Sequence, residues 1–208
     1  APTSTPSTQV TVSPKAQPTA TPAPTLSPEP VTPPVHCYQR TYRIGSVDPV
    51  FAQYGFNSAR LADMVRIVEN NWEVAIREDA FRNDASSTNV ITFTSAPIAT
   101  TADGYGTFTA DRIFRNGTVD AFDISIHAAL FSYVDTAFAQ NTYIGAKTSL
   151  EKLYESMMMR TLLKQFGHAL GLKNFSGDQQ YAEDAIMVGN GMWALTSYPA
   201  ELTTNDMN

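Results

Sequence analysis

The residues of this chain that could do chemistry are concentrated in one run, KQFGHALGLKN, which extends from Lys164 to Asn174. His168 carries an imidazole, which can bind a metal ion or transfer a proton near neutral pH. Lys164 is a cation with three donors and no lone pair, so it repels zinc. Gln165 can hydrogen-bond a water molecule but cannot take its proton. Asn174 offers one amide oxygen, a poor zinc ligand, and one imidazole alone does not make a zinc site.

Seven consecutive residues of this run, FGHALGL at 166 to 172, resemble the zinc helix of the matrixin branch of the metzincin metalloproteases, H-E-F-G-H-A-L-G-L-x-H. The later run Ala185-Ile186-Met187 resembles the methionine turn beneath the metal in that family. In such a helix, two histidines four residues apart share one face, and the glutamate between them is the general base. The resemblance implies a peptidase fold in which Gly171 ends the helix and Met187 belongs to the turn.

The residues that depart from the family pattern are those that would bind zinc and activate the water. The resemblance implies a histidine at position 164, the general-base glutamate at 165 and a further histidine at 174, where this chain has Lys164, Gln165 and Asn174. Of the implied ligands His168 is retained, and loss of the general base removes a factor of roughly 10² to 10⁴ in rate. Zinc is the cofactor expected from the family, but we expect this chain not to bind it. We further hypothesise that the Lys164 ammonium takes the metal's place and donates to the Asn174 oxygen.

Other potential ligands lie outside this run. His127 falls on a predicted strand, where a histidine is more often a packing or surface residue than a ligand, and His36 borders a proline-rich segment. Cys37 is the one cysteine of the chain, so no intrachain disulfide can form. Matrixin relatives use an upstream cysteine as a zinc ligand that keeps the enzyme latent. Cys37 could be such a switch, but a switch needs a zinc ion, and we prefer a free thiol.

A strand and a helix are predicted to open the folded part. Tyr42 and Ile44 alternate with polar neighbours, which predicts a strand. Asn57 or Ser58 can cap the following helix. Its apolar residues recur at three- and four-residue spacing, at Leu61, Met64, Val65, Val68, Trp72 and Ile76.

Strands and a long helix are predicted to follow. Residues 90–94, VITFT, have the β-branched and aromatic composition of a strand. Residues 107–131 predict a hairpin with its turn at Asn116-Gly117 and an inward face at Phe122, Ile124 and Ile126. Thr148 and Glu151 have the form of a capping box, and the helix that they begin should run toward Leu170 and stop at Gly171.

These elements predict an α+β domain at residues 37–208. The resemblance refines this to a metzincin-type catalytic domain with a twisted mixed β-sheet, a long active-site helix and a methionine turn. It extends from Tyr38 to the C-terminus and includes the Tyr42 strand, Trp72 and the 90–93 strand. Residues 202–206 resemble the start of the family's last helix, so we expect a C-terminally truncated domain.

Composition bounds the remaining possibilities. Residues 1–36 are rich in Thr, Ser, Pro and Ala, which predicts a disordered linker or stalk and a secreted or surface-attached protein. The net charge of −6 and the lack of a Lys/Arg cluster argue against a nucleic-acid partner. No apolar run reaches the length needed to span a bilayer.

Three functions are compatible with these observations. The favoured hypothesis is a zinc-free pseudoprotease that binds a peptide or protein partner in a protease-like cleft. The second is an active zinc endopeptidase with an unusual ligand set. The third is a purely structural surface domain that binds no peptide.

Overall fold

The computed structural model describes residues 39–98, 104–113, 119–142 and 148–173. The chain divides into two compact units, Ala1–Val35 and His36–Asn208, and all described residues belong to the second unit. In chain order its elements are β1 (Arg40–Val47), α1 (Val50–Gln53), α2 (Ser58–Ile76), β2 (Phe81–Asn83), β3 (Val90–Thr94), β4 (Gly106–Ile113), β5 (Val119–His127), α3 (Ala129–Ala139) and α4 (Leu150–Ala169).

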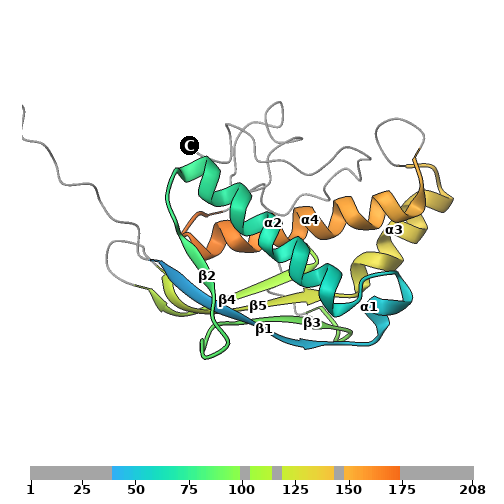
Figure 1. Cartoon of the computed structure of the whole chain (residues 1–208). Helices are drawn as coiled ribbons and strands as arrows, with labels where there is room; N and C mark the ends of the chain where they lie inside the picture. Colours follow the sequence, from blue (N-terminus) through green and yellow to red (C-terminus); the bar gives the residue numbers. More distant parts are fainter. Residues whose placement is uncertain (1–38, 99–103, 114–118, 143–147, 174–208) are drawn as a thin grey trace, which may run out of the picture. The chain divides into compact units, whose positions relative to one another are not determined.

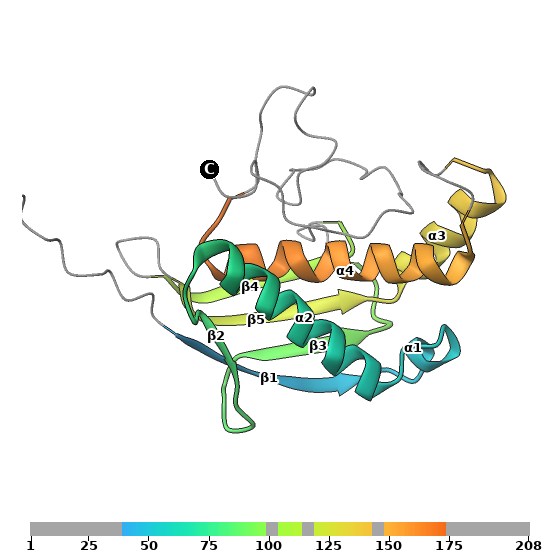
Figure 2. The ribbon, with the colours of Figure 1, turned by 45° about the horizontal axis from the view of Figure 1, so that its top comes forward.

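The strands form one five-stranded mixed sheet in the order β2-β1-β3-β5-β4. The pairs β1–β2, β1–β3 and β3–β5 are parallel, whereas β4 pairs with β5 in antiparallel orientation. Figures 1 and 2 show α2 and α4 on the same face of this sheet. The predicted mixture of strands and helices around a mixed sheet is therefore confirmed.

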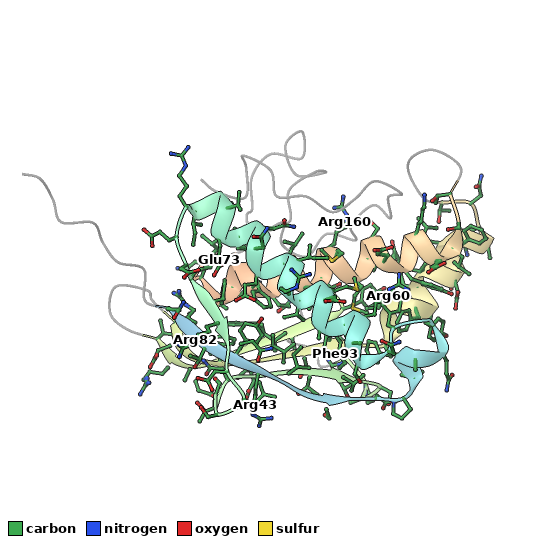
Figure 3. The ribbon with its side chains drawn as sticks, in the orientation of Figure 1. Arg43, Arg60, Glu73, Arg82, Phe93 and Arg160 are labelled. Atoms are coloured by element: carbon green, nitrogen blue, oxygen red, sulfur yellow. The ribbon has the colours of Figure 1, made fainter. Side chains whose placement is uncertain are left out.

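The apolar core lies between the sheet and these helices. Successive side chains of a strand point to opposite faces of the sheet, so that one set can be buried. In β5, Phe122, Ile124 and Ile126 are all buried, as the alternation predicted. Phe93 of β3 packs edge-on against Phe51 of α1, with ring centroids 5.5 Å apart (Phe93 is labelled in Figure 3). The largest fully buried side chain is Trp72 of α2.

Helix α2 forms as its sequence predicts. Asn57 is its N-cap, and its side-chain oxygen accepts a hydrogen bond from the Arg60 backbone nitrogen at 2.9 Å. The predicted apolar stripe faces the core, apart from Ile76 at the end, which is partly buried. Arg60, labelled in Figure 3, also forms ion pairs with Glu151 and Glu155 of α4 at 3.3 and 3.5 Å. These contacts fix α2 against the helix that carries the candidate site.

The predicted hairpin is confirmed, because β4 pairs with β5 in antiparallel orientation and β5 ends at His127. Two details need correction. The stretch 107–131 also contains the start of α3, in which Phe131 lies. Helix α3 follows because Leu130, Phe131, Val134 and Ala137 bury one face at helical spacing. The cap of α4 is Ser149 rather than Thr148, because the Ser149 hydroxyl accepts from the Lys152 nitrogen at 3.3 Å. The predicted turn at 116–117 lies outside the described residues.

No helix in the described ranges is long and apolar enough to cross a membrane.

Candidate functional site

Helix α4 carries the candidate site, and its second half is buried on every side. A surface helix normally has one apolar stripe and one polar face. From Arg160 to Gly167, however, every residue of α4 is buried, including the polar residues Arg160, Thr161, Lys164 and Gln165. Thr161 satisfies its hydroxyl within the helix, by donating to the Met157 carbonyl at 2.9 Å. The polar groups of this half-helix are therefore part of the interior rather than of the surface.

The end of α4 is set by Gly171. Its φ of +91° lies in the left-handed region, which a glycine adopts without strain. The Leu172 nitrogen donates to the Gly167 carbonyl at 3.0 Å, and the Gly171 nitrogen donates to the His168 carbonyl at 2.9 Å. This pair of bonds is a Schellman motif. The predicted stop of the helix at Gly171 is confirmed, and the turn brings Leu172 back beside the His168 ring.

The His168 ring is half-buried in the last turn of α4, with defined neighbours. Its Nδ1 lies 2.9 Å from the carbonyl oxygen of Leu172. Because a carbonyl can only accept, Nδ1 carries the hydrogen, and in the neutral ring the lone pair is on Nε2. The ring also lies near Phe108 of β4, with ring centroids 5.7 Å apart. His168 is thus held between the helix end and strand β4.

Gln165, at the position implied for the general base, packs against the backbone of β4. It is fully buried, at 0% exposure. A Cβ atom placed on Gly106 would meet the Gln165 atoms Cδ and Nε2 at 2.7 Å and Cγ at 2.8 Å. Helix α4 and strand β4 can approach this closely because position 106 is a glycine. Gln165 acts in the packing between α4 and β4.

Lys164 is also fully buried, at 1% exposure, one helical turn before His168. Residues four apart lie on the same side of a helix, about 5–6 Å apart at their Cβ atoms. A metal ion held by the His168 ring would therefore have a buried lysine at its next ligand position. Lys164 is not left without a partner in the structure.

These donors do not fit zinc. The metal needs lone pairs from three or four groups, and an ammonium has none to give. In the parts of the chain that the structure describes, no group of three or more His, Cys, Asp or Glu side chains could hold a metal ion. Asn174, the remaining position implied by the resemblance, lies outside the described residues, as do Met187, Cys37 and His36.

His127 takes part in packing within the sheet. It is buried at the end of β5, with Nε2 2.9 Å from the Thr107 hydroxyl and Nδ1 3.2 Å from the Ala96 carbonyl. Both ring nitrogens therefore have protein partners. This placement agrees with the packing role preferred from the sequence.

Residues distant in the sequence hold α4 in place. The Trp72 Nε1 of α2 donates to the Leu163 carbonyl at 2.9 Å. One turn further along, the Phe166 ring lies 5.7 Å from the Tyr42 ring and 4.8 Å from the Phe81 ring, both edge-on. Three aromatic side chains thus fix the turn of α4 between Leu163 and Phe166.

Sequence reasoning missed the two β4 residues that line the site, Gly106 and Phe108. Their contacts with Gln165 and His168 join segments far apart in the chain. Gly106 did offer a signal, because a glycine within a strand often marks a close approach of another element. Phe108 offered none beyond its place on the inward side of β4.

Two carboxylates in the C-terminal half of α2, Glu69 and Glu73, bond to residues of β1 and β2. The Tyr42 hydroxyl donates to Glu69 at 2.8 Å, and Glu73, labelled in Figure 3, accepts from the Phe81 nitrogen at 3.0 Å. Burial raises the pKa of the Tyr42 hydroxyl well above its usual range. Burial also raises the pKa of the Glu69 carboxyl, and the charges of Glu73 and Asp79 add to this increase. These groups link α2 to β1 and β2.

Comparison with known proteins gives a fold likeness alone. No protein-family model and no curated protein matches the chain. Among solved structures, it is similar to a chain of "GM1 bound form of the ECX AB5 holotoxin", with a TM-score of 0.51 and 16% sequence identity. The similarity covers 80% of this chain and 76% of that chain. Since the identity is so low, the likeness concerns how the chain folds and not what it does.

Proposed function

We propose that residues 37–208 form a metzincin-type domain that has lost its metal and its hydrolytic activity and that binds a peptide or protein. The proposal rests first on the resemblance of residues 166–172 to a zinc helix. The buried course of α4 and its end at Gly171 are compatible with that resemblance. A location outside the cell, suggested by the Pro- and Thr-rich segment, is part of the same proposal.

The observation that carries the proposal is the burial of Lys164 and Gln165. Neither side chain is exposed by more than 1%. At the position implied for a ligand there is an ammonium, and at the position implied for the general base there is an amide packed on Gly106. An amide cannot take a proton from water, and an ammonium cannot ligate zinc. These two positions therefore supply neither the zinc ligand nor the general base that hydrolysis needs.

Strand β4 offers the means to bind an extended peptide. It lies at one end of the strand order, and β5 is the one described strand that pairs with it. An edge strand presents backbone donors and acceptors to which a peptide can add as a further strand. Phe108 belongs to this strand, and the half-buried His168 lies near its ring. We infer that a peptide would align with β4 and contact this pair.

The proposal is tested by measuring metal, cleavage and binding in the same protein. The purified chain should contain far less than one zinc per molecule by mass spectrometry, even after incubation with zinc and desalting. It should leave casein uncleaved, with or without a chelator. Immobilised casein, which is largely unfolded, should nevertheless retain the chain. Stoichiometric zinc together with chelator-sensitive cleavage would refute the loss of activity, and absent casein retention would favour a purely structural domain.

A matched variant provides the positive control. Substituting Lys164→His, Gln165→Glu and Asn174→His together restores the implied ligand set and general base. This triple variant should take up more zinc than the unmodified chain in the same assay. The comparison separates a chain that lacks ligands from an assay that cannot detect them.

One observation keeps the active zinc endopeptidase as a second candidate. The hydrogen bond from His168 Nδ1 to the Leu172 carbonyl leaves Nε2 with the lone pair, and metal-binding histidines commonly have this arrangement. An active enzyme would need further ligands from outside the described residues. The zinc measurement decides between the two candidates.

A further inference from the structure

We propose that Lys164 is a built-in cation that stabilises the interior of the domain where a related fold would hold a metal ion. The inference rests on the proposed absence of metal from this site. It concerns the stability of the domain rather than its binding of peptides.

Lys164 is unusual among the lysines that the structure describes. It belongs to the largest fully buried side chains of the domain, whereas Lys152, in the first turn of the same helix, is exposed. Lysine is almost never fully buried unless its ammonium is paired, because moving an unpaired charge out of water is very unfavourable. Lys164 is indeed not left without a partner. The surroundings of this side chain are therefore suited to a cation.

Lys164 lies where its ammonium would compete with a metal ion bound to His168. His168 lies one turn further along α4, on the same side of the helix, with its Nε2 able to offer a lone pair. A divalent ion at that nitrogen would lie close to the Lys164 ammonium in a poorly solvated interior, where like charges repel strongly. The lysine and a metal ion are thus alternatives for one place. This predicts that removing the lysine charge destabilises the domain and that a metal ion can replace it.

Single substitutions of Lys164 test the idea through thermal unfolding of the 208-residue chain. Lys164→Met keeps the length of the side chain and removes the charge, so its midpoint should fall by about 6 °C or more, because the buried group that paired with the ammonium is left unsatisfied. Lys152→Met is the matched control, and its midpoint should stay within about 1 °C because that residue is exposed. A Lys164→Met midpoint equal to or above that of the unmodified chain would overturn the proposal.

Zinc rescue provides the second measurement, which decides the matter even if Lys164→Met does not fold. Lys164→His places two histidines four residues apart on α4, a pair that can bind zinc. In a chelator its midpoint should fall below that of the unmodified chain, and excess zinc should recover at least about half of the loss, because a ligand that binds the folded state stabilises it. The proposal would be overturned if the Lys164→His midpoint in the chelator equalled that of the unmodified chain. It would also be overturned if zinc did not raise the Lys164→His midpoint.

The outcome for the unmodified chain distinguishes this inference from the proposed function. Its midpoint should change with neither chelator nor zinc. A rise with zinc would overturn both the inference and the metal-free function. An unchanged midpoint combined with a harmless Lys164→Met substitution would overturn the inference alone.

Discussion

Substitution of Gly106 by alanine tests the closest contact between α4 and the sheet. The new Cβ would lie 2.7–2.8 Å from three Gln165 atoms, well inside normal contact distance. Gln165 is fully buried, so it has little room to move away. Overpacking of this kind typically costs about 1–3 kcal/mol. Replacing a strand glycine also stabilises the folded state by roughly 0.5–1 kcal/mol through the lower entropy of the unfolded chain. The clash is the larger effect, so Gly106→Ala should destabilise the domain by about 1–2 kcal/mol.

The sign should change when Gln165 is shortened. In a Gln165→Ala background the obstructing atoms are absent, and the entropic gain remains. Gly106→Ala should then be neutral or stabilising by up to about 1 kcal/mol. Urea unfolding of the unmodified chain, both single variants and the double variant gives the coupling between the two positions. An equal effect of Gly106→Ala in both backgrounds would refute the contact on which the reasoning depends.

Three further predictions follow from contacts around α4 and α2. Trp72→Phe removes the hydrogen bond to the Leu163 carbonyl and leaves unfilled volume, so the free energy of unfolding in urea should fall by about 1–3 kcal/mol; an unchanged urea midpoint would contradict the packing of α2 on α4. Gly171→Ala forces a Cβ into the left-handed region at φ +91° and should cost about 1–2 kcal/mol by the same assay; a free energy of unfolding equal to that of the unmodified chain would contradict the left-handed end of α4. In the folded state, burial raises the pKa of Glu69 above its ordinary value of 4.5. The folded state therefore binds the Glu69 proton more tightly than the unfolded chain does. The free energy of unfolding falls as pH rises through the raised pKa. Glu69→Gln, which can still accept from Tyr42, should therefore be more stable than the unmodified chain at pH 7, with the difference vanishing by about pH 4; a constant difference across this range would contradict the assignment.

Local patterns in the sequence predicted much of the fold. The range 90–94 is β3 as predicted, and α2 begins after Asn57 and buries the expected stripe. Both predictions depended on spacing and capping, which act within a few residues. The stop of α4 at Gly171 belongs to the same class, because a left-handed glycine ends a helix through bonds to the preceding turn.

Elements that are short, or that depend on contacts with distant parts of the chain, were not predicted. β2 has three residues, Phe81–Asn83, and gains its hydrogen bonds from β1 rather than from its own composition. α1, Val50–Gln53, is a single turn without a side-chain cap. α3, Ala129–Ala139, follows directly after the predicted strand and was not predicted as a helix. In each case the stabilising contacts come from distant parts of the chain.

The candidate site was predicted only as a set of positions along α4. The sequence singled out Lys164, Gln165 and His168 as candidate site residues, but it did not show that the first two are buried. Their polarity argues for exposure, because lysine and glutamine are seldom fully buried. Tertiary packing decided their environment, through the contact of Gln165 with Gly106 and the bond from Trp72 of α2 to the Leu163 carbonyl.

The bond between Trp72 and the Leu163 carbonyl has a consequence for how the protein folds. It joins residues 91 positions apart, and the parallel pairing of β1 with β3 and β3 with β5 is also non-local. During synthesis, the buried face of α2 emerges long before the helix that covers it. Folding must therefore wait for α4, and domains dominated by such distant contacts commonly fold in milliseconds to seconds rather than microseconds. Until then, the exposed Trp72 face is the surface on which nascent chains of this protein would be expected to associate or to engage a chaperone.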